Sequence, residues 1–271
     1  HPISSIINYL ICIRKLSHGN SNAYTDSQVS FNPILMKSFI HATILALTSA
    51  FAIAVDKQKK GYIPDVVVPQ ELEATLFSPN TLTPCVACIG VAPTGEVYAG
   101  VDQIGSLGKG GGKGKIIRLI DEDHDGIHDS HTVYAVIDNP RGIVPVGDKL
   151  YVLHTKWGEG TQFDGMFLSV LEDKNGDGLA DGPPKHLVKE ISTRKFNQAR
   201  GVDHTTNGIR MGIDGWIYVA IGDFGFVDAT GTDGKKLTMY GGGIIRVRPD
   251  GTELETYATG LRNIYDVAID P

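Results

Sequence analysis

The stretch "VDHTTNGIRMGIDGWIYVAIGDFG", residues 202–225, contains the pattern of a β-hairpin. Ile209, Met211 and Ile213 alternate with other residues, Asp214-Gly215 is a turn dipeptide, and an unbroken apolar run starts at Trp216. Alternation, a turn signal and β-branched residues together predict two antiparallel strands. Most of the stretch is therefore explained by strand pairing alone.

The same pattern recurs elsewhere in the chain. "GVAPTGEVYAG" starts at Gly90, "GIVPVGDKLYVLH" at Gly142, and "DVAIDP" at Asp266. The complete units also share a second half, which is "GKIIRLIDEDHDG", "GMFLSVLEDKNGDG" or "GGIIRVRPDG". Gly90 and Gly142 lie 52 residues apart, and so do Asp121 and Asp173. A unit of roughly 50 residues with four strands is typical of a propeller blade.

The repeat predicts an all-β fold, a β-propeller built from four-stranded blades. About three blades are present, with the opening strand of another, and insertions at 155–165, 192–203 and 224–240 explain the wider later spacing. A blade cannot cover its own apolar faces, so blades must stack on their neighbours in a ring. We therefore interpret residues 70–271 as the N-terminal part of a propeller domain that continues beyond Pro271.

The N-terminal part of the chain does not follow the repeat. "MKSFIHATILALTSAFAIA", residues 36–54, has a positive start, an apolar stretch and a small-x-small end at Ala52-Ile53-Ala54. This is the pattern of a secretory signal peptide, which predicts a secreted or periplasmic protein. Residues 1–35 would then be an unstructured upstream extension and 55–69 a linker. The alternative is an uncleaved helix that anchors the protein, since 38–55 is nearly long enough to span a membrane.

The charge and the cysteines restrict the partners. The net charge is −6 and the basic residues are scattered, so the sequence predicts no nucleic-acid partner. Cys85 and Cys88 form a C-V-A-C motif, but Ile89 stands where covalent haem attachment needs a histidine. We expect either a local disulfide or two buried thiols.

The four units can be aligned on their first residues, which are Gly90, Gly142, Gly208 and Asp266. The residues four positions before these landmarks then form one aligned column. Val86, Asp138, His204 and Arg262 occupy it. Residues that enter the innermost strands of a propeller surround one mouth of its channel, so the last three are predicted to face a shared space. The alternative is that they are polar only because a channel mouth is wet.

Two segments resemble a known family. Residues 203–225 resemble the Asp-His…strand…Ile-Gly-Asp segment of the soluble quinoprotein glucose dehydrogenases and the related aldose and sorbosone dehydrogenases. "YGGGIIRVRPDG" and "YATGLRNIYDVAIDP" resemble their Gly-x-(apolar)-x-Arg strand and Gly-x-Arg-Asn motif. The acidic turns are similar to those of the planctomycete-type "membrane-bound dehydrogenase" propellers, some of which have a C-terminal haem domain.

The resemblance implies a six-bladed propeller that oxidises a sugar or related alcohol by hydride transfer to pyrroloquinoline quinone (PQQ), with calcium as a second cofactor. It implies His204, beside Asp203, as the general base, and Arg262 and Asn263 as contacts of the quinone. An external electron acceptor, such as a haem protein, would reoxidise the cofactor. The alternative function is a non-catalytic propeller that binds a glycan or a protein and has structural calcium loops.

Two acidic loops, "DEDHDGIHD" at 121–129 and "DKNGDGLAD" at 173–181, have the same spacing. Alternating carboxylates around a glycine turn can bind calcium. The candidate ligands are Asp121, Asp123, Asp125 and Asp129 in the first loop and Asp173, Asn175, Asp177 and Asp181 in the second. The alternative, which we favour, is a hairpin turn in which these side chains accept bonds from backbone N–H groups.

The Gly-rich segment at 105–115, "GSLGKGGGKGK", lacks the Gly-Lys-Ser/Thr ending of a phosphate-binding loop. We expect it to be a flexible loop near the channel mouth.

Overall fold

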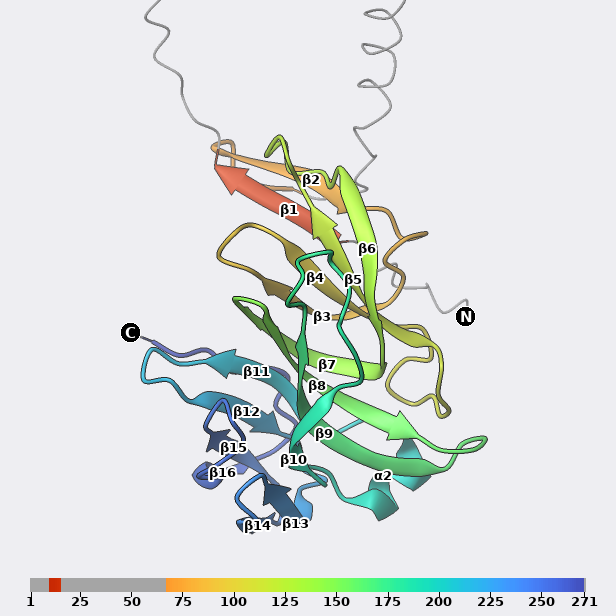
Figure 1. Ribbon diagram of the computed structural model, residues 1–271, viewed down its shortest axis with the longest axis vertical. Coiled ribbons are helices and arrows are strands. Elements are labelled where there is room, and N and C mark those ends of the chain that lie inside the picture. Colours follow the sequence, from red (N-terminus) through yellow and green to blue (C-terminus); the bar gives the residue numbers. More distant parts are fainter. Residues whose placement is uncertain (1–9, 16–66, 271) are drawn as a thin grey trace, which may run out of the picture. The chain divides into compact units, whose positions relative to one another are not determined.

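The computed structural model describes residues 10–15 and 67–270 of the 271-residue chain. Within these residues the chain forms β-strands and one short helix, α2 (Arg194–Arg200), so the all-β prediction is confirmed (Figure 1). No helix in this part of the chain is long and apolar enough to cross a membrane. The predicted signal peptide at 36–54 lies outside the described residues.

Three four-stranded antiparallel units follow one another along the chain. Blade 1 consists of β3 (Val86–Val91), β4 (Val97–Asp102), β5 (Gly114–Ile120) and β6 (Ser130–Val136). Blade 2 consists of β7 (Asp138–Val146), β8 (Lys149–Trp157), β9 (Phe163–Glu172) and β10 (Lys185–Lys189). Blade 3 consists of β11 (Asn207–Met211), β12 (Ile217–Ile221), β15 (Gly242–Val247) and β16 (Glu255–Leu261). The prediction of about three four-stranded blades is confirmed, and the six blades of a complete ring stay a prediction.

The insertion predicted at 224–240 forms a hairpin with an unexpected partner. Its strands are β13 (Phe226–Gly231) and β14 (Lys236–Met239). Although the hairpin interrupts blade 3 in sequence, β13 pairs antiparallel with β10 of blade 2, with Val188 opposite Gly231. Blade 2 thus becomes a six-stranded sheet, and the unpaired edge of β10 is covered. The insertion joins two neighbouring blades through backbone hydrogen bonds.

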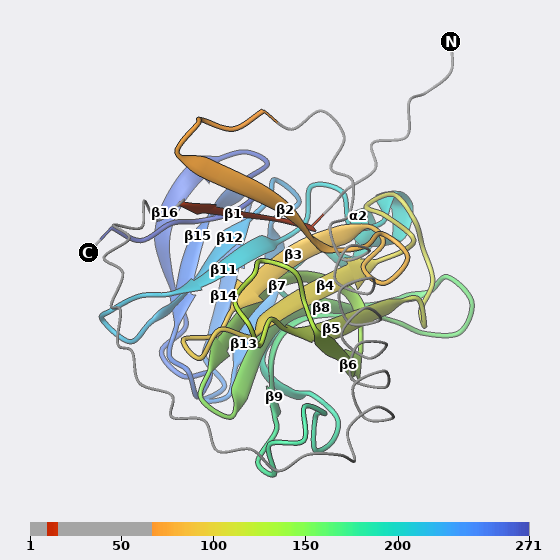
Figure 2. The ribbon, with the colours of Figure 1, turned by 90° about the horizontal axis from the view of Figure 1, so that it is seen from above.

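The landmark glycine of each repeat lies where successive inner strands meet. β3, β7 and β11 are the first strands of the three blades, and each contacts the next (Figure 2). A Cβ atom on Gly90 would lie 2.7 Å from a backbone oxygen of β7, and one on Gly142 would lie 2.9 Å from a backbone nitrogen of β11. A Cβ on Gly208 would lie 2.7 Å from the Cα of Asp266. The repeat therefore contains glycine at this position because only glycine allows the inner strands to approach so closely.

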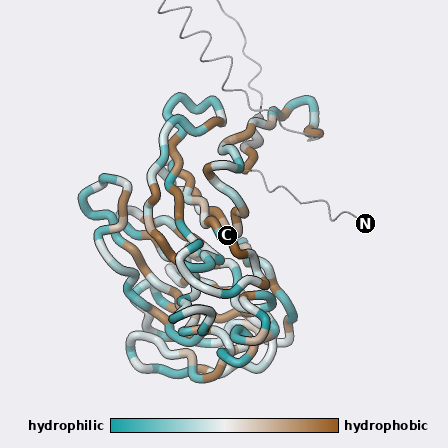
Figure 3. The backbone as a smooth tube through the Cα atoms, turned by 90° about the vertical axis from the view of Figure 1, so that its right-hand side faces the viewer, coloured by the Kyte–Doolittle hydropathy of each residue, from teal (hydrophilic) through white to brown (hydrophobic). Residues whose placement is uncertain are grey.

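Apolar side chains fill the spaces between blades. One cluster joins residues of blade 2, such as Leu153 and Met166, to residues of blade 3, such as Ile209 and Val219. A second cluster joins blades 1 and 2 and contains Ile116. In Figure 3 the hydrophobic residues follow the strands and the hydrophilic ones gather at the turns. Each fully buried side chain of this kind contributes about 1.5–3 kcal/mol, so the stacking of blades stabilises all three.

A second compact unit comprises Ile11–Phe77, and residues 78–271 belong to the first. Its described strands, β1 (Leu10–Lys15) and β2 (Leu72–Ser78), form a two-stranded sheet. The expectation that residues 1–35 are unstructured is therefore wrong for Leu10–Lys15. The reason is composition, since Leu10, Ile11 and Ile13 favour a strand.

The two cysteines of the C-V-A-C motif are free thiols, so the expected disulfide is absent. The alternative of two buried thiols is also wrong for Cys85, which is exposed, whereas Cys88 is half-buried and burial raises its pKa to about 12. Cys85 lies in the turn before β3, with a φ of +52°, whereas Cys88 lies within β3, so the two thiols have different surroundings.

Candidate functional site

His204 lies three residues before β11, in a segment that the neighbouring strand holds in place. Its backbone φ is +56°, in the left-handed region that residues other than glycine adopt only occasionally. The carbonyl oxygen of His204 accepts a hydrogen bond from Phe224 N at 3.2 Å, and that of Thr205 accepts one from Gly222 N at 3.1 Å. Unusual backbone angles persist where the surroundings enforce them, often at functional sites. The end of β12 thus fixes the position of the imidazole.

Two carboxylates flank the His204 ring. Nδ1 lies 2.6 Å from Oδ1 of Asp223, and Nε2 lies 3.7 Å from Oδ2 of Asp203. Asp203 is itself held by Arg200, whose Nη2 donates a 2.6 Å hydrogen bond to it. A neutral histidine that donates its Nδ1–H to a carboxylate keeps a lone pair on Nε2. The His204 side chain is 19% exposed.

Arg262 contacts the same carboxylate from the other side. Its Nε lies 3.7 Å from Oδ2 of Asp223, and its side chain is 80% exposed. Asn263, the next residue, is also exposed. The structure therefore brings together His204, Asp203 and Arg262 of the predicted site, of which His204 and Arg262 share the repeat column. Their predicted chemical roles stay predictions.

Asp138, the third polar residue of the column, has a different partner. Its Oδ1 accepts a 2.7 Å hydrogen bond from the backbone N–H of Gly112, in the Gly-rich loop. Ser106 in the same loop accepts a 2.7 Å bond, at its carbonyl oxygen, from the backbone N–H of Val202. The loop is thus anchored near the segment that contains His204, and Leu107 within it is 67% exposed. The loop was expected to lie near the channel mouth and to be flexible. Two hydrogen bonds, to Asp138 and from Val202, instead tie it to neighbouring segments.

One aromatic ring, from the segment after β12, stacks on the imidazole, and a second, from the insertion at 192–203, packs against the first. The rings of His204 and Phe224 are stacked, with centroids 5.9 Å apart at 21°. Phe196 of α2 lies 5.3 Å from Phe224 and is 44% exposed. The guanidinium of Arg200 also lies over Phe224, at 5.9 Å. One wall of the site is therefore apolar, with a cation at its edge.

The sequence analysis did not assign roles to Asp223 and Phe224. Asp223 is the last residue of the Ile-Gly-Asp motif that supported the family resemblance, so a signal for it existed. Phe224 had no such signal, because a single aromatic residue after a strand is common in any β-protein. The ring became recognisable only through its contacts with His204 and with the inserted helix.

The acidic loops lie at the turns β5–β6 and β9–β10, and their side chains cap backbone groups. Asp121 accepts hydrogen bonds from the N–H groups of Asp125 and Gly126, and Asp173 accepts them from Gly176 and Gly178. The remaining side-chain acceptors in the two loops are Asp123, Asp125, Asp129, Asn175, Asp177 and Asp181, each bonded to a backbone N–H of its own loop. These bonds are those of the hairpin-turn alternative.

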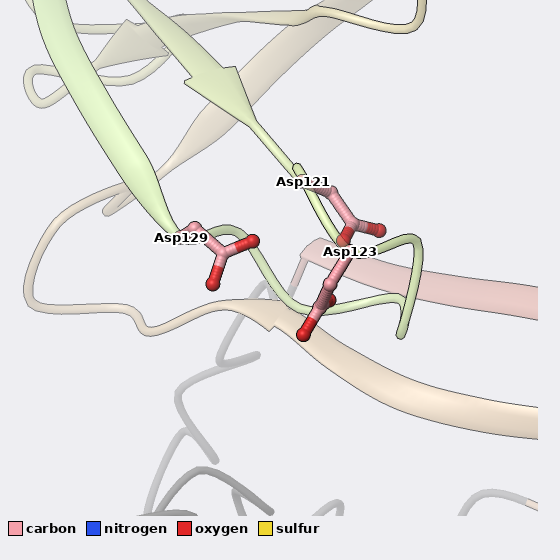
Figure 4. A group of neighbouring side chains, drawn as sticks. All are labelled: Asp121, Asp123 and Asp129. Carbon is pink, nitrogen blue, oxygen red and sulfur yellow. The ribbon is translucent and has the colours of Figure 1, made fainter.

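A cation site in the first loop is still geometrically possible. Ligand atoms of Asp121, Asp123 and Asp129 all lie within 4.8 Å of one another (Figure 4). A calcium ion there would share carboxylate oxygens that already accept backbone N–H bonds. Calcium binding by either loop stays a prediction.

Comparisons with known proteins place the chain in a family. A model of the family described as "Domain of unknown function (DUF7133)" matches residues 90–271. No curated protein matches the chain in sequence.

Two solved structures resemble the chain weakly. One, from Thermus thermophilus, is assigned as an oxidoreductase (glucose dehydrogenase); it has 16% identity and a TM-score of 0.40, over 62% of this chain and 46% of that one. The other, the periplasmic gluconolactonase PpgL of Pseudomonas aeruginosa, has 13% identity and a TM-score of 0.29, over 63% of this chain and 70% of that one. The chain thus spans less than half the length of the first structure.

Proposed function

The chain belongs to the family described as "Domain of unknown function (DUF7133)", and we propose that it forms part of an exported PQQ-dependent dehydrogenase that oxidises a sugar or related alcohol. The observation that carries the proposal is the shared carboxylate of Asp223, which joins a candidate base, His204, to a candidate quinone contact, Arg262. The family resemblance of residues 203–225 and 257–271 supports the same assignment.

His204 would act as the general base through Nε2. Because Nδ1–H is donated to Asp223, the lone pair of Nε2 can accept the proton of a substrate hydroxyl. The imidazolium that forms lies between two carboxylates, Asp223 at 2.6 Å and Asp203 at 3.7 Å, and both stabilise its positive charge. Asp223 also fixes the ring orientation, since His204 cannot rotate without breaking this bond. The proton thus moves from the hydroxyl oxygen to Nε2 of His204.

The residues at the other side of Asp223 fit the proposed cofactor. The guanidinium of Arg262 is largely exposed, so donors remain for an oxygen-rich, anionic partner, and Asn263 adds an amide beside it. Arg262 and Asn263 would hold the quinone, which when bound supplies the two-electron acceptor for the hydride of the substrate carbon. The exposed ring of Phe196 and the stacked ring of Phe224 would cover the apolar side of the substrate and exclude water.

The signal-peptide pattern at 36–54 supports export, so we propose a secreted or periplasmic protein whose cofactor is reoxidised by an external acceptor such as a haem protein. If the acidic loops bind calcium, its role is structural, because these loops lie at turns between outer strands and their internal hydrogen bonds hold the turns without it.

The first test is a titration of the full chain with PQQ, with and without calcium, followed by absorbance. We expect saturable binding that Arg262→Ala weakens about 10-fold or more, which is the loss of one charged hydrogen bond. Lys236→Ala on β14, whose side chain is also exposed, is the matched control and should bind as the wild type does. His204→Ala should retain binding and lose alcohol-dependent reduction of the quinone. No saturable binding would overturn the assignment and favour the non-catalytic binding module.

A further inference from the structure

A cavity of about 220 Å³ lies where the inner strands of the three blades meet. It is lined by β3, by Arg141 of β7, by Arg210 of β11, and by Tyr265 and Asp266 of the segment after β16. His204 and Arg262 are not among its lining residues. In each of blades 2 and 3, and in the segment after β16, the lining residues come three or more positions after the column that contains Asp138, His204 and Arg262. In blade 1 the column residue Val86 itself lines the cavity, so the cavity adjoins the candidate site but has none of His204, Asp203 and Arg262 in its lining.

Arg141 is a buried cation in the wall of this cavity. Its side chain is 10% exposed, and its Nη2 pairs at 2.7 Å with Asp102, which is 2% exposed. Asp102 accepts a second bond, at 3.0 Å, from the side-chain amide of Asn139. The Nε of Arg141 is buried without a hydrogen-bond partner, and burial lowers the pKa of this guanidinium. This Nε has almost no accessible surface, so a ligand in the cavity cannot reach it and would contact only the exposed part of the guanidinium.

The charges around the cavity are balanced. Arg210 pairs at 2.6 Å with Asp266, and the two side chains are 43% and 38% exposed. Arg141 is thus neutralised by the buried Asp102, which is not a lining residue, and Arg210 by Asp266, which leaves no net charge to attract an ion. An arginine–carboxylate pair presents donors and acceptors side by side, and a hydroxyl group, which donates and accepts, satisfies both. The lining therefore suits a neutral ligand with several hydroxyl groups.

Tyr265 contributes apolar surface to the cavity and connects the segment after β16 to β3. Its side chain is 76% exposed, and its hydroxyl donates to the carbonyl oxygen of Ala87 in β3 at 3.4 Å. Val86 and Cys88 of the same strand also line the cavity. Small-molecule sites combine such apolar surface for C–H groups with a few placed polar groups.

We propose that this cavity binds a small neutral polyol, at a site that adjoins the one that contains His204 but does not include that residue. A dry cavity of about 150 Å³ accepts benzene, with six heavy atoms, so 220 Å³ accommodates roughly nine. A four-carbon polyol, with eight heavy atoms, has this size. The hydroxyl groups would bond to Arg141 and to the Arg210–Asp266 pair, and the carbon chain would lie against Tyr265. The proposal does not rest on the quinone chemistry.

The test uses erythritol as the probe, in an NMR titration of the full chain. We expect saturable shifts, and we expect Tyr265→Ala and Arg141→Lys each to weaken binding about 10-fold or more. Tyr265 is exposed, so its replacement leaves the fold intact even where Arg141→Lys does not fold. Tyr240→Ala, at a tyrosine that is 88% exposed and does not line the cavity, is the matched control and should bind erythritol normally.

Two further measurements distinguish a polyol site in this cavity from binding at the His204 site and from an anion site. His204→Ala should bind erythritol as the wild type does, because His204 does not line the cavity; loss of binding would place the polyol at the other site and overturn the proposal. Acetate should not compete with erythritol, and effective competition would show an anion site instead. Absence of saturable erythritol binding to the wild-type chain would also overturn it, whatever the outcome of the quinone titration.

Discussion

His204 and Arg262 approach the two oxygens of one carboxylate, that of Asp223, with Nδ1 2.6 Å from Oδ1 and the guanidinium Nε 3.7 Å from Oδ2. The two residues are 58 positions apart in the sequence and occupy the same position in successive repeats. Asp223 follows β12, the strand that pairs with the inner strand after His204. The repeat therefore places an imidazole and a guanidinium beside the same carboxylate.

This arrangement predicts the tautomer of His204. In the wild type the neutral ring should carry its proton on Nδ1, and Asp223→Ala should raise the population with the proton on Nε2, because the acceptor at Nδ1 is lost. The ¹⁵N chemical shifts of the two ring nitrogens measure this ratio directly and require no cofactor.

The matched control for this prediction is Asp228→Ala, at an exposed aspartate on β13, which should leave the His204 signals unchanged. An unchanged ratio in Asp223→Ala would mean that the carboxylate does not orient the imidazole.

The close approach of the inner strands predicts a cost for enlarging Gly142. A Cβ there would lie 2.9 Å from a backbone nitrogen and 3.0 Å from a side-chain carbon of Ile209. Gly142→Ala should lower the free energy of unfolding by about 1–3 kcal/mol, the usual cost of overpacking, and urea denaturation measures it. In Gly158→Ala the new Cβ would approach only the end of the Asp164 side chain, at 3.2 Å. That variant should change little, and equal losses in both would contradict the packing argument.

The repeated glycine also shows how much of the fold the sequence specifies. Gly90, Gly142 and Gly208 mark equivalent backbone contacts, so aligning them predicted the blades and the positions of His204 and Arg262. Those features follow from the local residue pattern and from the spacing of the repeat, and both can be read from a single sequence.

The features that were missed depend on tertiary contacts. The hairpin β13–β14 pairs with β10 of the preceding blade, and nothing in 226–239 specifies which strand edge it meets. Asp138 has the same repeat position as His204, but its carboxylate bonds to the Gly-rich loop of blade 1. Column position thus predicted where a side chain lies and could not predict its partner.

A buried histidine in blade 2 predicts a pH-dependent stability. His154 is 3% exposed, with Nε2 2.8 Å from Ser169 Oγ and Nδ1 2.9 Å from the carbonyl oxygen of Thr155. Burial, together with the smaller effect of the nearby His186, lowers its pKa from 6.5 to about 4. The unfolded chain therefore binds the proton more readily, so stability is full above pH 6.5 and falls as the pH drops toward 4.

The size of this effect can be measured by urea denaturation at pH 7 and pH 4. The pKa difference corresponds to about 3 kcal/mol lost over this range. His154→Gln should lose about 3 kcal/mol less than the wild type between the two pH values. His131→Gln, at an exposed histidine of β6, should retain the wild-type dependence. A wild-type stability that does not fall toward pH 4 would contradict the burial of a neutral His154.

The hydrogen bonds of the acidic loops predict that these turns hold their shape without calcium. Asp173 accepts bonds of 2.8 and 2.9 Å from the N–H groups of Gly176 and Gly178, so Asp173→Ala should cost about 1–3 kcal/mol of stability. Because the bonds lie within the chain, the loss should be the same in chelator and in millimolar calcium, as measured by the shift in Tm. Asp121→Ala should behave alike, since Asp121 bonds to Asp125 and Gly126 in the equivalent way. A wild-type Tm that rises with calcium, and that Asp121→Ala makes insensitive to it, would instead show that the loop is a cation site, for which the cluster of Asp121, Asp123 and Asp129 is the candidate.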